Sequence, residues 1–207
     1  SSDDNDTANL TLSAAYTPVN ISNIENINLD WNAFGTATYD LDSVTGAETV
    51  TLTSSKVGYL GAATVTNADA MNLVAGSGTV GTLTASGFKT GSVDAGAAKT
   101  VVVNGTGTNA DNESIEVTAD TATSVTVGTT NGFASATVSA AKATTIAIAD
   151  AGNTTDTISL TTGVNTTVTN GATGAVSINA AADTTVTMAL IGNTAEITGD
   201  GDVILVA

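Results

Sequence analysis

The chain has 207 residues, with 20 Asp and Glu against 4 Lys and no Arg, His or Cys, so its formal net charge is −16. Phosphate binding requires clustered Lys and Arg, so this charge excludes nucleic acid as a partner and opposes binding to an anionic membrane surface. Divalent cations are the partners that such a surface favours, because carboxylate, Asn and backbone oxygens are hard ligands.

No apolar stretch approaches the roughly 18 residues of a membrane span, so we expect no membrane insertion. The absence of Cys means that the fold requires no disulfides. The sequence begins at Ser1 without an initiator Met or a signal peptide, and an apolar run, Val203–Val206, lies near its end. We interpret it as a processed protein or a fragment of a longer one.

Residues 1–60 differ in composition from the rest and are expected to form an N-terminal β cap or lead-in segment. Apolar residues alternate with polar ones through Ile21, Ile27 and Leu29, which predicts strands. A repeat array needs an atypical end coil, so an aromatic cap is one interpretation of this segment. An aromatic platform that binds sugar is the alternative. Five of the seven aromatic residues lie here: Tyr16, Trp31, Phe34, Tyr39 and Tyr59.

Residues 61–207 contain two kinds of short apolar patch that alternate along the chain. The first kind occurs at Lys99–Val103, Thr123–Val127, Thr144–Ile148, Thr166–Asn170 and Thr184–Met188, with lead residues Val101, Val125, Ile146, Val168 and Val186. The second kind centres on Val93, Ile115, Val138, Ile158, Val176 and Ile197. Gly, Asn, Asp and Ala fill the intervals, and these residues form turns.

This pattern predicts an all-β fold, a parallel β-solenoid (β-helix) with about seven coils of roughly 21 residues and two strands per coil over residues 61–207. Each strand is too short to bury its own apolar face, and stacking of coils supplies the missing contacts. The 41 Thr and 21 Gly oppose helix formation. A β-sandwich built from hairpins is the alternative, because Asn-Gly pairs occur at Asn104, Asn131 and Asn170.

The side-chain inventory opposes enzymatic activity. Without His or Cys the chain lacks the usual general base, the thiol nucleophile and the usual zinc ligands. A glycosidase can work with two carboxylates alone. A solenoid that cuts anionic polysaccharide would nevertheless need basic residues to hold its substrate, and only four Lys are present. We therefore predict no enzymatic activity, no catalytic residues and no organic cofactor.

Pairs of acidic residues two positions apart are the candidate metal ligands. In a strand this spacing places both carboxylates on one face, and in a turn it lets both converge on one calcium ion. A solvated turn is the alternative for each pair. The predicted calcium-binding residues are Asp40, Asp42, Asp111, Glu113, Asp200 and Asp202, and a further pair occurs at Asp4 and Asp6. The sequence around Asp200, TGDGDVILV at Thr198–Val206, is similar to part of a calcium-binding RTX nonapeptide, but it does not recur in tandem.

Thr-x-Thr triplets recur along the chain. In-register Thr hydroxyls and methyls would suit an ice-binding face, whereas the simpler interpretation is that Thr is a good exposed strand residue. The triplets fail at coils with the sequences TVVV and TIAI. They occur within Thr49–Thr53, Thr64–Thr66, Thr82–Thr84, Thr167–Thr169 and Thr185–Thr187.

The Thr-, Ala-, Gly- and Asn-rich coils, the acidity and phrases such as NIENINLDW and GAETVTLTSSKVG resemble Gram-negative S-layer proteins and RTX-related repetitive surface proteins. The resemblance covers most of the chain. The chain differs from these families because it lacks tandem nonapeptides. It implies a secreted protein that forms a lattice on the cell, usually with calcium and often anchored to lipopolysaccharide.

From these observations we predict an extracellular, cell-surface structural protein that associates with itself, with calcium as an assisting ion and cell-surface polysaccharide as a further partner. The alternative of a different class is a stalk or passenger segment of a secreted adhesin that binds glycan or ice.

Overall fold

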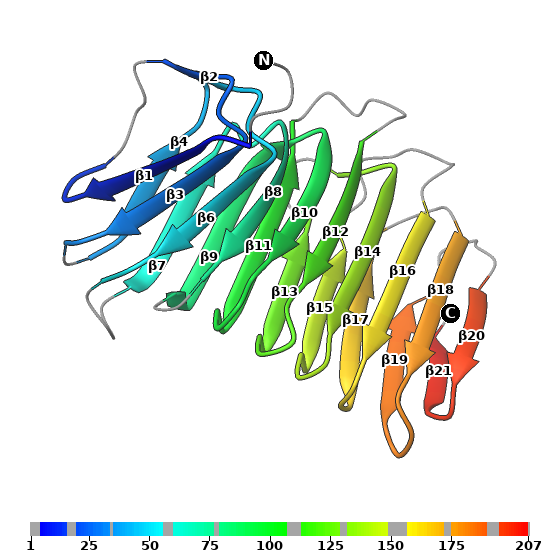
Figure 1. Cartoon of the computed structure of the whole chain (residues 1–207). Coiled ribbons are helices and arrows are strands. Elements are labelled where there is room, and N and C mark those ends of the chain that lie inside the picture. The colour runs from blue at the N-terminus through cyan, green and yellow to red at the C-terminus, as the bar shows by residue number, and fades with distance from the viewer. Residues whose placement is uncertain are drawn as a thin grey trace.

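The computed structural model describes residues 5–15, 20–33, 35–55, 60–76, 79–106, 113–128, 132–148, 157–171, 175–189 and 195–206. These residues form a parallel β-solenoid, a rod whose coils run from the N-terminal to the C-terminal end (Figure 1). Two sheets make the long sides of the rod. All strand pairings among the described residues are parallel, so the β-solenoid prediction is confirmed and the hairpin sandwich is wrong.

The larger sheet, here sheet A, has ten strands within the described residues. Its strands are β1 (Thr7–Leu12), β3 (Asn26–Trp31), β6 (Thr49–Thr53), β8 (Ala70–Ala75), β10 (Thr90–Asp94), β12 (Ser114–Thr118), β14 (Ser135–Ala140), β16 (Thr157–Thr162), β18 (Ala175–Ala180) and β20 (Ala195–Gly199). Seven of them, from β8 to β20, fall after residue 61, in agreement with the expected number of coils.

The second sheet, here sheet B, has nine strands in the same described ranges. They are β4 (Ala37–Asp40), β7 (Leu60–Thr66), β9 (Thr79–Phe88), β11 (Thr100–Gly105), β13 (Ser124–Val127), β15 (Thr145–Ile148), β17 (Thr166–Asn170), β19 (Thr185–Ala189) and β21 (Asp202–Val206). A short pair, β2 (Ile21–Ser22) with β5 (Val44–Thr45), lies beside the first coils.

The sheets continue across residue 60. Strand β6 pairs with β8, and β4 pairs with β7, so the first 60 residues share both sheets with the rest of the chain. Whether they act as a separate cap remains a prediction. The coil length varies around the predicted value, from 17 residues between Met188 and Leu205 to 26 between Thr38 and Thr64.

Inward side chains stack into ladders, because alternate residues of each strand face the interior and each coil repeats them in register. One ladder in sheet A joins Ile27, Val50, Leu73, Val93, Val117, Val138, Leu160 and Ile178, each at most 1% exposed. The facing ladder in sheet B joins Leu83, Val101, Val125, Ile146, Val168 and Met188. Each such aliphatic side chain stabilises the fold by about 1.5–3 kcal/mol when fully buried.

The register corrects one detail of the predicted repeat. Val168 pairs with Met188, whereas Val186 pairs with Thr166. Thr166 takes an inward position at 2% exposure because its hydroxyl donates to the Ala143 carbonyl at 2.8 Å. A shift of two residues keeps the same side chains inward, so the apolar pattern alone does not distinguish the two registers.

Corners from sheet A to sheet B are tight and rich in alanine. In three successive coils a buried Ala carbonyl accepts the backbone N–H of a buried Ala three residues later, at 3.0–3.2 Å. The pairs are Ala95 with Ala98, Ala119 with Ala122, and Ala140 with Ala143. A methyl group fills the narrow space where the two sheets converge, which explains why Ala recurs between the apolar patches.

Gly91 tests how closely the coils approach each other. Its φ is +147°, and a Cβ atom there would lie 2.1 Å from the carbonyl oxygen of Met71 on the preceding coil. We expect Gly91→Ala to lower the free energy of unfolding by about 2–3 kcal/mol more than Gly35→Ala. Gly35 is the matched control, because its φ is also positive but a Cβ atom would meet no atom within 4 Å. Urea unfolding checks this, and equal losses would contradict it.

Tyr39 provides a second test of the core. Its hydroxyl is buried without a hydrogen-bond partner, while its ring packs edge-on against Trp31 with centroids 6.1 Å apart. We expect Tyr39→Phe to raise the free energy of unfolding by about 1 kcal/mol, because it removes an unsatisfied polar group. Tyr39→Leu should lower it, because the aromatic pair is lost. A less stable Phe variant would show that the hydroxyl bonds to buried water.

Candidate functional site

The predicted calcium pairs lie at separate corners of the rod. Asp40 ends β4 and Asp42 lies in the following turn, Glu113 directly precedes β12, and Asp200 and Asp202 flank the corner between β20 and β21. Asp111 and Asp4 lie outside the described residues. Within the part of the chain that the structure describes, no group of three or more His, Cys, Asp or Glu could hold a metal ion. A calcium ion at any of these corners would therefore need backbone, amide and water oxygens, and calcium binding stays a prediction.

Asp40 acts as a link between coils. Its Oδ1 accepts a hydrogen bond from the Asn67 side-chain amide at 2.8 Å and from the backbone N–H of Asp42 at 3.1 Å. The first bond joins β4 to the turn of the next coil, and the second closes a local turn. The Asn67 amide, followed by the Asp42 N–H, holds the pKa of the Asp40 carboxyl below its ordinary value.

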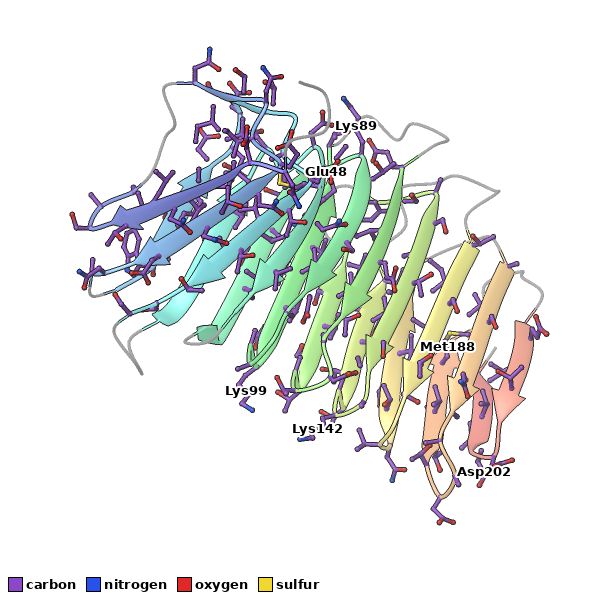
Figure 2. All side chains as sticks on the ribbon, in the orientation of Figure 1. Glu48, Lys89, Lys99, Lys142, Met188 and Asp202 are labelled. Carbon is purple, nitrogen blue, oxygen red and sulfur yellow. The ribbon has the colours of Figure 1, made fainter. Side chains whose placement is uncertain are left out.

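Asp200 and Asp202 belong to a corner whose backbone lies against the preceding coil. The N–H of Gly201 donates to the Ala180 carbonyl at 3.1 Å, and that of Asp202 to the Thr184 carbonyl at 2.8 Å. A Cβ atom at Gly201 would lie 2.3 Å from the Ala181 oxygen, so glycine is required at this position. The glycines of the RTX-like phrase thus serve corner packing, while both carboxylates are exposed; Figure 2 shows Asp202 at this edge of the rod.

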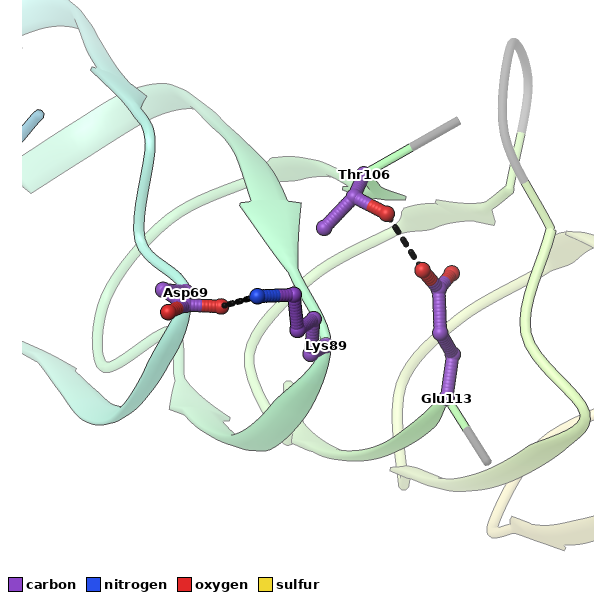
Figure 3. Close-up of polar contacts among 4 residues, drawn as sticks. All are labelled: Asp69, Lys89, Thr106 and Glu113. Carbon is purple, nitrogen blue, oxygen red and sulfur yellow. Dashed lines mark hydrogen bonds and ion pairs between the residues drawn. The ribbon is translucent and has the colours of Figure 1, made fainter. Parts of the chain in front are cut away.

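Glu113 is buried, with 2% of its surface exposed. Thr106, directly after β11, donates its hydroxyl hydrogen bond to the Glu113 carboxylate (Figure 3). This contact joins the two residues on either side of the segment 107–112. Burial and this hydroxyl contact indicate a structural role in the connection from β11 to β12.

Further carboxylates link successive coils, and the sequence analysis missed this role. Asp30 accepts the Ser55 backbone N–H at 2.7 Å, and Asp120 accepts the Ser139 hydroxyl at 3.2 Å. Glu25 accepts the backbone N–H of Asp6 at 2.9 Å. The signal was an acidic residue at or next to the end of an apolar patch, but only the stacking shows which donor on a neighbouring coil it contacts.

A cavity of about 390 Å³ lies beside Asp42 and is also lined by Asn67, Asp69, Lys89 and Thr106. Asp69 pairs with the Lys89 ammonium at 3.1 Å (Figure 3). The Lys89 charge opposes a second cation in the same cavity, so this concave site does not favour calcium.

A shallow groove of about 340 Å³ crosses the outer face of sheet A over β14, β16, β18 and β20. Hydroxyl groups dominate its polar lining, with Thr137, Ser159 and Ser177 in one column and Glu196 at its end. These groups can donate and accept hydrogen bonds, which suits a neutral hydroxylated ligand.

The aromatic residues do not form a sugar-binding platform in the described part of the chain. Trp31 and Tyr39 are 4% and 0% exposed and face the interior. Burial, followed by the charge of Asp30, raises the pKa of the Tyr39 hydroxyl far above its ordinary value, so it stays protonated. Tyr16, Phe34 and Tyr59 lie outside the described residues. Trp31 and Tyr39 therefore belong to the core of the first coils.

The Thr-x-Thr triplets fall mainly on one surface. Thr64–Thr66, Thr82–Thr84, Thr167–Thr169 and Thr185–Thr187 lie in strands of sheet B, whereas Thr49–Thr53 forms β6 of sheet A.

Comparisons with known proteins return no match: no family model, no curated protein and no solved structure is similar to this chain. In the ranges that the structure describes, no helix is long and apolar enough to span a bilayer.

The lowered pKa of Asp40 predicts how stability depends on pH. Its folded pKa lies below the unfolded value of about 3.9, so its contribution is present above that value and is lost as the pH falls through the folded pKa. We expect Asp40→Asn to lower the melting temperature at pH 7 and to approach the wild type as the pH falls through the folded pKa of Asp40. Asp42→Asn is the matched control. It removes the same charge, but among the described residues the Asp42 carboxylate accepts no hydrogen bond. Identical pH profiles for the two variants would contradict the assignment.

Proposed function

We propose that this chain is a structural protein of the cell surface that associates with itself, in the manner of S-layer proteins, with calcium as an assisting ion. The observation that carries the proposal is the coil formed by β20 and β21. These are the outermost strands of sheets A and B, and each has one edge without a partner in the described structure.

The side chains of this coil show what an additional coil would cover. Ile197 continues the inward ladder of Ile178, and Leu205 continues that of Met188. Ile178 and Met188 are 0% and 1% exposed, whereas Ile197 and Leu205 are 46% and 38% exposed. The difference arises because a coil packs on the first two, whereas no described coil packs on the last two.

A second copy can supply a further coil with the correct polarity. The strands at the opposite end of the rod, β1 and β4, are parallel to the others in their sheets. Pairing of β1 with β20 of another molecule would thus continue the parallel ladder. Head-to-tail contacts generate extended assemblies when their rotation does not close a ring. Unpaired strand edges are the usual templates for such addition.

The net charge explains why calcium would assist. Copies that each carry −16 repel one another, and cations that bind exposed carboxylates reduce this repulsion. Asp200 and Asp202, both exposed beside the last coil, are the nearest candidates.

A second candidate function is the stalk of an adhesin that binds glycan. The hydroxyl-lined groove over β14–β20 favours it, because neutral sugar offers matching donors and acceptors. This function predicts isolated rods.

Electron microscopy of the purified chain distinguishes these functions. We expect ordered assemblies in millimolar calcium that dissociate in excess chelator. Leu205→Asn should abolish them, because it places an amide in the apolar junction at little cost to the single rod, where Leu205 is already exposed. Ile204→Asn is the matched control: Ile204 is 51% exposed but pairs with the outward Thr187. Isolated rods with and without calcium would overturn self-association.

A further inference from the structure

The outer face of sheet B carries a two-dimensional array of threonine. One column joins Thr82, Thr100, Ser124, Thr145, Thr167 and Thr187, with each residue in register with the next. A parallel column joins Thr38, Thr64, Thr84, Val102, Thr126, Ala147 and Thr169. We call these two columns the threonine face.

The strand register shows that the interrupted triplets do not interrupt the first column of hydroxyls. The triplet fails in the coils TVVV and TIAI, yet the first column stays unbroken there, because Thr100 and Thr145 supply its hydroxyls. Only the second column changes in these coils, where it carries Val102 and Ala147. Their side chains are β-branched or small, so they do not protrude from the face.

The threonine face is uncharged on a strongly acidic protein. None of the seven strands from β7 to β19 in sheet B contains Lys, Asp or Glu. In contrast, the outer face of sheet A carries Asp94, Glu116 and Glu196, all exposed. Charged groups bind their own hydration shell strongly, so their absence leaves a surface whose water is organised by hydroxyls and methyls alone.

The geometry of the array is regular. Adjacent coils are about 4.8 Å apart, and alternate residues of one strand about 6.6 Å apart. Threonine is β-branched, so χ1 is restricted and its hydroxyl and methyl hold defined directions. Each hydroxyl both donates and accepts hydrogen bonds. We propose that the threonine face binds crystalline water, that is, the surface of ice.

A second copy of the chain fits this face less well. The seven strands span roughly 30 Å and their exposed width is roughly 16 Å, which gives a face of about 500 Å². Stable protein interfaces bury about 800 Å² on each partner. Two copies that each carry −16 also repel one another, whereas ice carries no net charge.

The test uses the whole chain and two lysine variants. The probe is polycrystalline ice in sucrose solution, annealed just below the melting point, and the readout is the rate of ice recrystallisation. Thr145→Lys places a long charged side chain in the middle of the threonine face. The matched control, Thr161→Lys, makes the same change at an exposed outward position of β16 in sheet A, outside the hydroxyl-lined groove. Thr167→Lys, also exposed in the first column, replaces Thr145→Lys if that variant does not fold.

We expect the wild type and Thr161→Lys to inhibit recrystallisation, and Thr145→Lys to lose this inhibition with an unchanged urea unfolding midpoint. A wild type without effect on ice, or equal loss in both variants, overturns the proposal. A dimer in sedimentation that only Thr145→Lys dissociates, without an effect on ice, would also overturn it and assign the face to contacts between copies. The result does not depend on end-to-end assembly, which Leu205→Asn tests separately.

Discussion

The in-register stacking of each coil on the next is the interaction on which the rest of this structure depends. A single coil has two short strands and cannot enclose its own apolar residues, so its stability comes from backbone pairing and side-chain ladders shared with two neighbours. Residues as far apart in sequence as Ile27 and Ile178 thereby belong to one ladder. The same constraint sets the corners, where the coils approach so closely that Ala fills the bend and glycine is required at Gly91 and Gly201.

Stacking also gives the acidic residues a structural role. Asp30, Asp40, Asp120 and Glu25 each accept a hydrogen bond from another coil, so they reinforce the ladder at its corners. Few cations balance them, and the described residues contain one ion pair, Asp69 with Lys89. The acidity is therefore compatible with folding, because corner carboxylates lie near solvent and bond to amides. It opposes close approach of two rods, which is the physical reason to connect assembly with calcium.

The rod presents three surfaces of different chemistry. The terminal coil exposes apolar side chains and has strand edges that no described strand pairs, the outer face of sheet A is polar and acidic, and the outer face of sheet B is neutral and rich in threonine. Extension of the ladder by another copy uses the terminal coil of one molecule and the first coil of the next, at the two ends of the rod. The long sides remain accessible in such an assembly, so end-to-end association and binding of a neutral lattice by the threonine face are compatible.

Alternating Val, Ile and Thr separated by turn residues favoured parallel coils over a hairpin sandwich, because both kinds of apolar patch keep their order at a steady interval. The sequence likewise indicated paired carboxylates at turns. It did not determine the pairing of Val168 with Met188, the donors that each Asp contacts, or the continuity of the threonine column through Thr100 and Thr145. These features depend on the offset between coils whose lengths vary, and an offset of two residues leaves the apolar pattern unchanged. Composition and periodicity thus determined the kind of fold, whereas only the stacked structure decided which side chains share a face.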